Sequence, residues 1–148
     1  MPAARPPPSL GLARLMFALN IVVAGAAAAF TLCAPEAAGR IIWSGLPSRR
    51  SSSHKAQLLA CMWAATAVCS ALAVWRPLAF SALLLFELAY KICWFAVIAF
   101  PAMRSGRADA VPPVVAAVFA LWIALLPAAI PWRWLLARPP TFAERKDD

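Results

Sequence analysis

Four long, mainly apolar runs constrain this chain more strongly than any other feature of its sequence. They cover residues 11–33, 56–75, 78–100 and 111–132. A helix rises about 1.5 Å per residue, so about 20 residues cross a hydrocarbon core of about 30 Å, and each run is long enough to do so. The alternating segments of about ten residues that build a membrane β-barrel do not occur. The sequence therefore predicts an all-α fold, a four-helix transmembrane bundle that forms one integral membrane domain over residues 1–148.

Composition agrees with a membrane location and excludes a soluble domain. Hydrophobic residues make up 64% of the 148 residues, charged residues make up 14%, and the mean hydropathy is +0.75. In soluble domains the apolar content is about 45–50%. Four crossings and their loops use nearly the whole length, which leaves no separate soluble domain. The expected partner is the lipid bilayer, while contacts with other membrane proteins and a homo-oligomer stay open.

The net charge of +8 does not indicate nucleic-acid binding, because the basic residues are spread over every loop and both tails and do not alternate with aromatic residues. Contact with anionic lipid headgroups accounts for them better. The numbers of basic residues on the two predicted sides differ by only one, which is too little to orient the bundle. We expect a bacterial cytoplasmic membrane with both termini in the cytoplasm, the common arrangement of bacterial bundles with an even number of crossings.

The connections between the runs predict how neighbouring helices lie. Arg76-Pro77 is nearly the whole link between the second and third runs, so these helices are expected to lie side by side as an antiparallel hairpin. The long first connection contains Ile41-Ile42-Trp43. Two alternatives stay open for it: an amphipathic half-turn at the membrane interface, or a solvated loop with three buried residues. The tail, residues 135–148, is polar and broken by prolines, and it is expected to be flexible.

Prolines and aromatic residues mark the ends of the fourth run. Pro112-Pro113 fall in its first turn, where missing N–H groups cost little, and Pro127 and Pro131 are expected to kink or end the helix. Tryptophan and arginine side chains favour the headgroup region. Three such residues come directly after Pro131 and are the predicted interface anchors: Trp132, Arg133 and Trp134.

Residues that carry familiar catalytic or metal chemistry are scarce. No CxxC pair occurs, and the single histidine, His54, lies in a loop. The cysteines all lie within or at the end of apolar runs: Cys33, Cys61, Cys69 and Cys93. Metal, iron–sulfur and haem sites need several ligands together, so no metal and no cofactor is predicted. Gly-rich phosphate loops, GxSxG and HExxH motifs are also missing. No catalytic residue is assigned, and a non-enzymatic role is favoured, while a membrane enzyme with a single active carboxylate stays open.

The third run contains two ionisable residues, Glu87 and Lys91, near its middle. Ionisable groups are costly at this depth and almost always face the protein interior. Their spacing of four residues puts both on one helical face, with the acid on the N-terminal side, which is the better orientation for an ion pair. Tyr90 and Trp94 flank the pair with a hydroxyl and an indole donor. The sequence therefore predicts a polar stripe that turns inward.

Polar side chains in the other runs lie at a similar predicted depth. Glu87 is nine residues into its run, which is about 13–14 Å along a helix. The same distance leads to Asn20 in the first run, to the vicinity of Thr66 in the second and to that of Trp122 in the fourth. We predict a polar layer near the middle of the membrane, in which Asn20 and Thr66 hydrogen-bond to Glu87.

Two functions are compatible with such a layer. In the first, the polar groups hold the helices in register, and the protein is a non-enzymatic accessory or scaffolding component of the membrane. In the second, Glu87 titrates or binds a ligand, and the protein is a transport or redox-associated subunit that takes a proton, a quinone or a lipid-like ligand. A single pair without further acids or histidines favours the first. A cavity that reaches Glu87 would favour the second.

Two stretches carry a resemblance to a known group. LLLFELAYKICWF in the third run and AIPWRWLL at the end of the fourth resemble small uncharacterised bacterial four-span membrane proteins, broadly those of the DoxX-like group. The resemblance implies a four-helix membrane bundle, which in some relatives is associated with thiol or quinone redox systems. It does not extend to the first run beyond Arg14, so no functional residue is carried over from the group.

Overall fold

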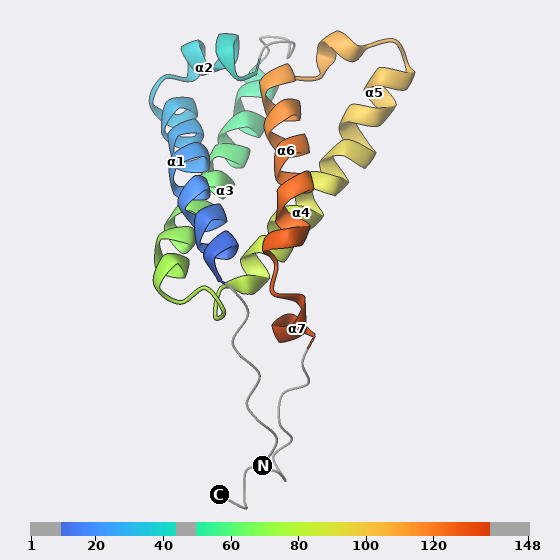
Figure 1. The fold of residues 1–148 in the computed structure, drawn as a ribbon. Coiled ribbons are helices and arrows are strands. Elements are labelled where there is room, and N and C mark those ends of the chain that lie inside the picture. Colours follow the sequence, from blue (N-terminus) through green and yellow to red (C-terminus); the bar gives the residue numbers. More distant parts are fainter. Residues whose placement is uncertain (1–9, 44–49, 137–148) are drawn as a thin grey trace, which may run out of the picture.

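The computed structural model describes residues 10–43 and 50–136, and this part of the chain contains helices and short connections but no strand. The all-α fold predicted from the sequence is therefore confirmed. The predicted flexible tail lies outside the described residues, apart from residues 135 and 136. In chain order the elements are α1 (Gly11–Cys33), α2 (Pro35–Ile41), α3 (Arg50–Trp75), α4 (Ser81–Trp94), the π-helical turn η1 (Phe95–Ala99), α5 (Phe100–Arg104), the 3₁₀ turn η2 (Ala108–Ala110), α6 (Pro113–Ala129) and α7 (Trp132–Leu135) (Figure 1).

Three helical stretches are long and apolar enough to cross a membrane: Gly11–Cys33, His54–Trp75 and Ser81–Arg104. The helix α6 is also apolar, but it has only 17 residues, which correspond to about 26 Å. It is shorter than the predicted run because prolines stand immediately before it and shortly after its end, where they cannot continue helical bonding. Length and composition make this chain an integral membrane protein.

The elements α4, η1 and α5 form one continuous helical stretch with a local widening. In η1 the amide of Phe100 donates to the carbonyl of Phe95, five residues earlier instead of four. Pro101 follows directly and has no N–H group, so regular α-helical bonding would lose a hydrogen bond at this point. The third span therefore continues to Arg104, past its predicted end at Phe100.

Prolines end α6 as predicted. Pro127 lies inside the helix, and Pro131 follows shortly after its end. Because Pro131 has no N–H group, the carbonyl of Pro127 lacks its helical donor. The indole N–H of Trp132 takes this place and donates to that carbonyl at 2.8 Å. Trp132 and Trp134 are 39% and 55% exposed, and their role as interface anchors stays a prediction.

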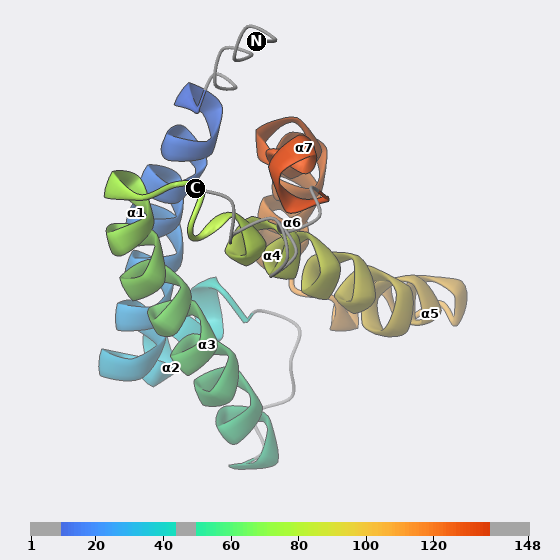
Figure 2. The ribbon, with the colours of Figure 1, turned by 90° about the horizontal axis from the view of Figure 1, so that it is seen from below.

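The long helices form two pairs that diverge. The helix α1 packs along α3, and α6 packs against α4, with a smaller contact between α1 and α6 (Figure 1). The start of α1 and the end of α6 lie at the same end of the bundle, the lower end in Figure 1. Seen from below, α4 and α5 lead away from α1 and α3 (Figure 2). The predicted side-by-side hairpin is therefore wrong, because α3 and α4 separate from the turn that connects them.

Small residues explain why α3 pairs with α1 instead. Lipid tails are as apolar as leucine side chains, so helices in a membrane associate where their surfaces approach closely. A Cβ atom added to Gly25 of α1 would lie 3.5 Å from the Cβ of Ala67 on α3, so little more than a methyl group fits between these helices. The large side chains Leu84 and Leu88 of α4 belong to an apolar cluster that also contains residues of the other long helices, among them Phe17, Ala73 and Leu126.

The segment Ile41-Ile42-Trp43 matches neither predicted alternative in full. Ile41 ends the short helix α2 and is exposed, whereas Trp43 is buried. The Trp43 indole donates to the hydroxyl of Thr31 at 3.3 Å, and its ring stacks on Trp63 of α3 with the ring centroids 5.5 Å apart. The segment therefore folds back over the pair formed by α1 and α3.

Candidate functional site

The helical phase of α4 turns Glu87 and Lys91 toward the interior of the protein. These two side chains are only 1% and 3% exposed, whereas Phe86 and Ile92 of the same helix are about half exposed. Leu84, at the i−3 position from Glu87, is also buried, so one stripe of α4 faces inward. The two ionisable groups lie inside the protein, as predicted, and not against lipid.

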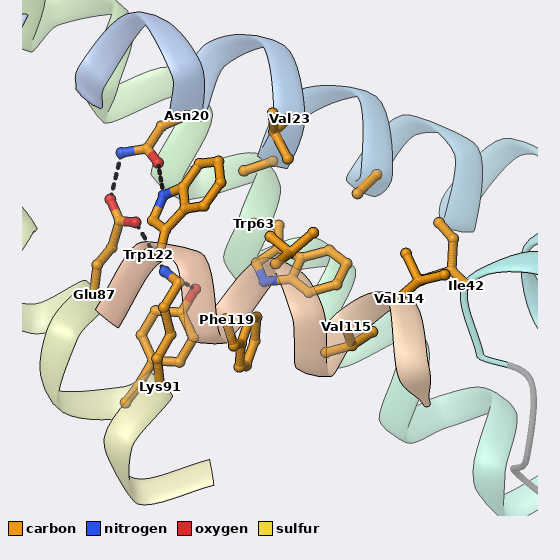
Figure 3. A pocket seen from close by; sticks show the side chains of 14 residues that line it. Asn20, Val23, Ile42, Trp63, Glu87, Lys91, Val114, Val115, Phe119 and Trp122 are labelled. Atoms are coloured by element: carbon orange, nitrogen blue, oxygen red, sulfur yellow. Dashed lines mark hydrogen bonds and ion pairs between the residues drawn. The ribbon is translucent and has the colours of Figure 1, made fainter. Parts of the chain in front are cut away.

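Both carboxylate oxygens of Glu87 accept hydrogen bonds (Figure 3). The Lys91 ammonium donates to Oε2 at 2.9 Å, and the Asn20 amide donates to Oε1 at 2.5 Å. Lys91 also donates to the Tyr90 hydroxyl at 2.8 Å. Charge-assisted bonds are stronger than neutral ones, and they offset the cost of removing two ions from water. The pair is thus neutralised and hydrogen-bonded within the protein.

Asn20 connects the pair to two further helices. Its amide nitrogen reaches the hydroxyl of Ser70 on α3 at 3.4 Å, and its oxygen accepts the indole N–H of Trp122 on α6 at 2.8 Å. Every fully buried side-chain nitrogen and oxygen atom of the described residues has a hydrogen-bond partner. We call this group the polar network; its members are Asn20, Ser70, Glu87, Tyr90, Lys91 and Trp122.

The predicted level of the polar layer is right for α1 and α6 and wrong for α3. Thr66 is buried, but Ser70, one helical turn further along α3, is the residue that meets Asn20. The prediction starts the third span at residue 78, whereas α4 begins at Ser81 after a turn over residues 77–80. Glu87 therefore lies nearly one helical turn closer to the lower end of the bundle, at the level of Ser70 and not of Thr66.

Trp94 lies outside the polar network, although the sequence places it beside the pair. Its ring meets Phe119 of α6 edge-on, with the ring centroids 5.2 Å apart. Tyr90 and Trp63 meet the same Phe119 ring edge-on, at 5.6 Å and 6.3 Å. The Lys91 ammonium lies 4.3 Å from the centroid of the Tyr90 ring, which is a cation–π distance. Aromatic rings from α3, α4 and α6 therefore lie next to the pair.

A pocket of about 130 Å³ lies beside the polar network (Figure 3). Its polar end is formed by Asn20, Glu87, Tyr90 and Lys91, and the rest of its wall is apolar or aromatic. The wall comes from α1, α3, α4 and α6, together with Ile42 at the end of α2. The sequence leaves open whether side chains close over Glu87, and the structure has a cavity there.

The pocket is elongated, with one polar end and one apolar end. Along α6 its lining residues extend from Trp122 to Val114, a separation of eight residues or about 12 Å. Figure 3 shows Val114 and Ile42 at the end away from Glu87. Val114 is 45% exposed, so the apolar end is the one that approaches the surface. The site can therefore hold a molecule with a polar group at one end and an apolar body.

Three residues of the site are missed by reasoning from the sequence: Ser70, Trp63 and Phe119. They are small or apolar residues in runs that consist of such residues, so their spacing does not mark them. The sequence does contain a signal that predicts α2, the short helix that ends directly before Ile42, and Ile42 lines the pocket. The helix has proline at its first position, an acid in its first turn and a base in its last, which match the preferences of helix ends.

Potential metal ligands do not gather at this site. Within the described residues, no group of three or more His, Cys, Asp or Glu side chains could hold a metal ion. The four cysteines are not joined in disulfides, and Cys33, Cys61 and Cys93 are exposed. The chemistry of the site is therefore that of the polar network and of the aromatic wall.

Comparisons with protein-family models, with curated proteins and with solved structures gave no match. The resemblance to the DoxX-like group therefore stays a proposal.

Proposed function

We propose that this protein binds a small, mainly apolar ligand within the membrane, in the pocket beside Glu87 and Lys91. The pocket carries the proposal, because its polar end contains the two side chains that are most costly to place at this depth. In this proposal the protein is a transport or redox-associated subunit of the bacterial cytoplasmic membrane, broadly of the DoxX-like kind. In this proposal α6 is the fourth crossing, and both termini are in the cytoplasm.

Packing around the ion pair supports ligand binding over a purely structural role. Protein interiors are packed about as densely as organic crystals, and few voids in them exceed the size of a water molecule. A network that served only to hold helices together would be covered by side chains. Here about 130 Å³ stays unfilled beside the network, and Glu87, Tyr90 and Lys91 are among the residues that line it.

The volume of the pocket sets the size of the ligand. An apolar cavity of about 150 Å³ holds one benzene molecule, so the pocket of about 130 Å³ suits one small ring or a short chain. A longer molecule would extend past Val114, where the pocket approaches the surface. Both a ring with a tail and a lipid-like chain meet these limits.

The position of α6 supports its assignment as a crossing. It packs against α4 and α1, both of which belong to stretches of spanning length. Its 17 residues are about 4 Å short of a hydrocarbon core of about 30 Å, a mismatch that bilayers accommodate by local thinning. Trp132 and Trp134 follow it and supply interface anchors.

A second candidate is the accessory or scaffolding role, and the polar network favours it. Through Asn20, α1 is hydrogen-bonded to Ser70 on α3, to Glu87 on α4 and to Trp122 on α6. Each such bond contributes about 0.6–2 kcal/mol in a membrane and fixes the rotation of the helices. A bundle held in this way would present constant surfaces to neighbouring membrane proteins.

Filling the pocket separates the two candidates. Val118→Phe places a larger side chain at a residue that lines the pocket, whereas Val22→Phe adds the same volume at an α1 residue that is 67% exposed. Wild type and both variants are purified in detergent micelles and titrated with 4-fluorotoluene, whose signal is followed by fluorine NMR. We expect a protein-dependent shift with wild type and with Val22→Phe, and none with Val118→Phe.

Equal shifts with wild type and with Val118→Phe would place the probe outside the pocket and refute ligand binding there. A wild type that shifts the probe no more than empty micelles do would refute it as well. If Val118→Phe then raised the thermal stability of the protein, the cavity would be a packing defect, and the scaffolding role would be supported.

A further inference from the structure

We infer that the pocket takes a neutral molecule that presents an acceptor oxygen, of the ketone or ester kind, to the hydroxyl of Tyr90. The inference rests on the proposed function and adds the chemical class of the ligand. It follows from three features of the pocket: the hydrogen-bond donors left at its polar end, its balanced charge and its aromatic wall.

Tyr90 has a hydroxyl proton that the polar network leaves unused. An ammonium group can only donate, so in the 2.8 Å bond between Lys91 and Tyr90 the phenolic oxygen is the acceptor. The proton of that hydroxyl must point elsewhere, and none of the hydrogen bonds found among the described residues uses it. Tyr90 lines the pocket, so an acceptor oxygen on a ligand would complete its bonding.

Lys91 offers a further donor to the same space. An ammonium has three protons, and Lys91 uses two of them for Glu87 and Tyr90. The oxygens of Glu87 already accept bonds from Asn20 and Lys91. The polar end therefore suits a ligand that accepts hydrogen bonds better than one that only donates them.

The ion pair determines the charge of the ligand. Glu87 and Lys91 balance each other at 2.9 Å, and they are the only charged residues that line the pocket in the described part of the chain. A cation would have to displace Lys91 from the carboxylate, and an anion would lie next to that carboxylate. Both arrangements are costly where the dielectric constant is low. A neutral ligand avoids both.

The aromatic wall favours a flat group next to the acceptor oxygen. Phe119 is at its centre, in edge-on contact with Tyr90 and Trp63, and Trp122 also lines the pocket. Aromatic rings add stabilisation in edge-to-face and offset arrangements beyond the area that they bury. An aryl ketone therefore satisfies the polar end and the wall together.

A matched pair of probes tests the inference on the unmodified protein. The molecules 4′-fluoroacetophenone and 4-fluoro-α-methylstyrene have nearly the same shape, but only the ketone has an acceptor oxygen. Their affinities are measured by fluorine NMR in detergent micelles, with Val118→Phe as the blank for partition into micelles. We expect the ketone to bind about three- to tenfold more tightly, which is the factor that one net hydrogen bond provides.

A variant pair locates the hydrogen bond. Tyr90→Phe keeps the ring and removes the hydroxyl, so it is expected to abolish the preference for the ketone. Ser105→Ala removes an exposed hydroxyl beyond the end of α5 and is expected to keep the preference. If Tyr90→Phe did not fold, equal affinities of the two probes for wild type would still overturn the inference.

The outcomes distinguish the inference from the proposed function. Equal affinities of the two probes for wild type, or a preference that survives Tyr90→Phe, would overturn the inference and leave ligand binding in place. Tighter binding of 4-fluorobenzoate or of (4-fluorobenzyl)trimethylammonium than of the ketone would also overturn it, because the ligand would then be charged. Absence of pocket-specific binding by every probe would refute the proposed function itself.

Discussion

The buried pair predicts a strong energetic coupling between Glu87 and Lys91, which a double-mutant cycle measures. Glu87→Gln keeps the shape of the side chain but leaves the Lys91 ammonium without its counter-charge. Lys91→Met does the reverse and leaves the carboxylate without its ammonium. The double variant has no charge at either position. Comparing the four proteins isolates the interaction between the two side chains.

The structure sets the expected magnitude. At 2.9 Å, two unit charges attract each other by about 6 kcal/mol at an effective dielectric constant of about 20. Desolvation offsets much of this attraction, because the two side chains are only 1% and 3% exposed. Removing one partner leaves the other buried and unpaired, so each single variant is expected to lose about 3–5 kcal/mol of unfolding free energy. The double variant should lose much less than the sum, with a coupling of at least about 2 kcal/mol.

The free energy of unfolding is measured by titrating SDS into mixed micelles and following the fluorescence of the seven tryptophans. Glu36 and Arg40 on α2 are the matched control, because they have the same spacing and both are exposed. A cycle of Glu36→Gln and Arg40→Met is expected to show a coupling below about 0.5 kcal/mol. A coupling equally small for Glu87 and Lys91 would refute the conclusion that they form a buried ion pair.

The remaining predictions concern the contact between α1 and α3, measured by the same titration. Gly25→Ala should change the free energy of unfolding by about 1 kcal/mol or less, because its Cβ would lie 3.5 Å from the nearest α3 side chain, an ordinary contact. Gly25→Leu should lower it by about 1–3 kcal/mol through overpacking. Gly39→Leu is the control, because nothing lies within 4 Å of the added Cβ. Equal losses for the two leucine variants would contradict the close approach of α1 and α3.

Features that depend on local rules could be predicted from the sequence. Apolar length predicts α1 with the bounds that it has, Gly11–Cys33, and Pro131 correctly indicates the end of α6. The contact of Glu87 with Lys91 and Asn20 could be predicted for two reasons. A membrane restricts polar groups to the protein interior, and the depth of a residue follows from its position along the helix.

Features that depend on several helices at once could not be predicted. The short link Arg76-Pro77 indicates neighbouring helices, but the pairing of α3 with α1 depends on small residues of both, Gly25 and Ala67. Ser70 and Trp63 reach the site because of the rotation of α3, which nothing in its own sequence reveals. The pocket is the space that four helices leave unfilled, so no single segment encodes it.

The central claim is that the face of α4 with Glu87 and Lys91 turns toward the protein interior. The accessibility of spin labels along α4 tests this claim without altering the ion pair. In a variant without the native cysteines, a nitroxide is attached to single cysteines at positions 84, 85, 86, 88 and 92, and its collisions with oxygen dissolved in lipid vesicles are measured. Leu84 and Leu88 are 0% and 9% exposed, whereas Leu85, Phe86 and Ile92 are 40%, 49% and 48% exposed. We predict low oxygen accessibility at positions 84 and 88 and high accessibility at the other three. Maxima at 84 and 88 would turn Glu87 and Lys91 toward the lipid and contradict both the polar network and the pocket.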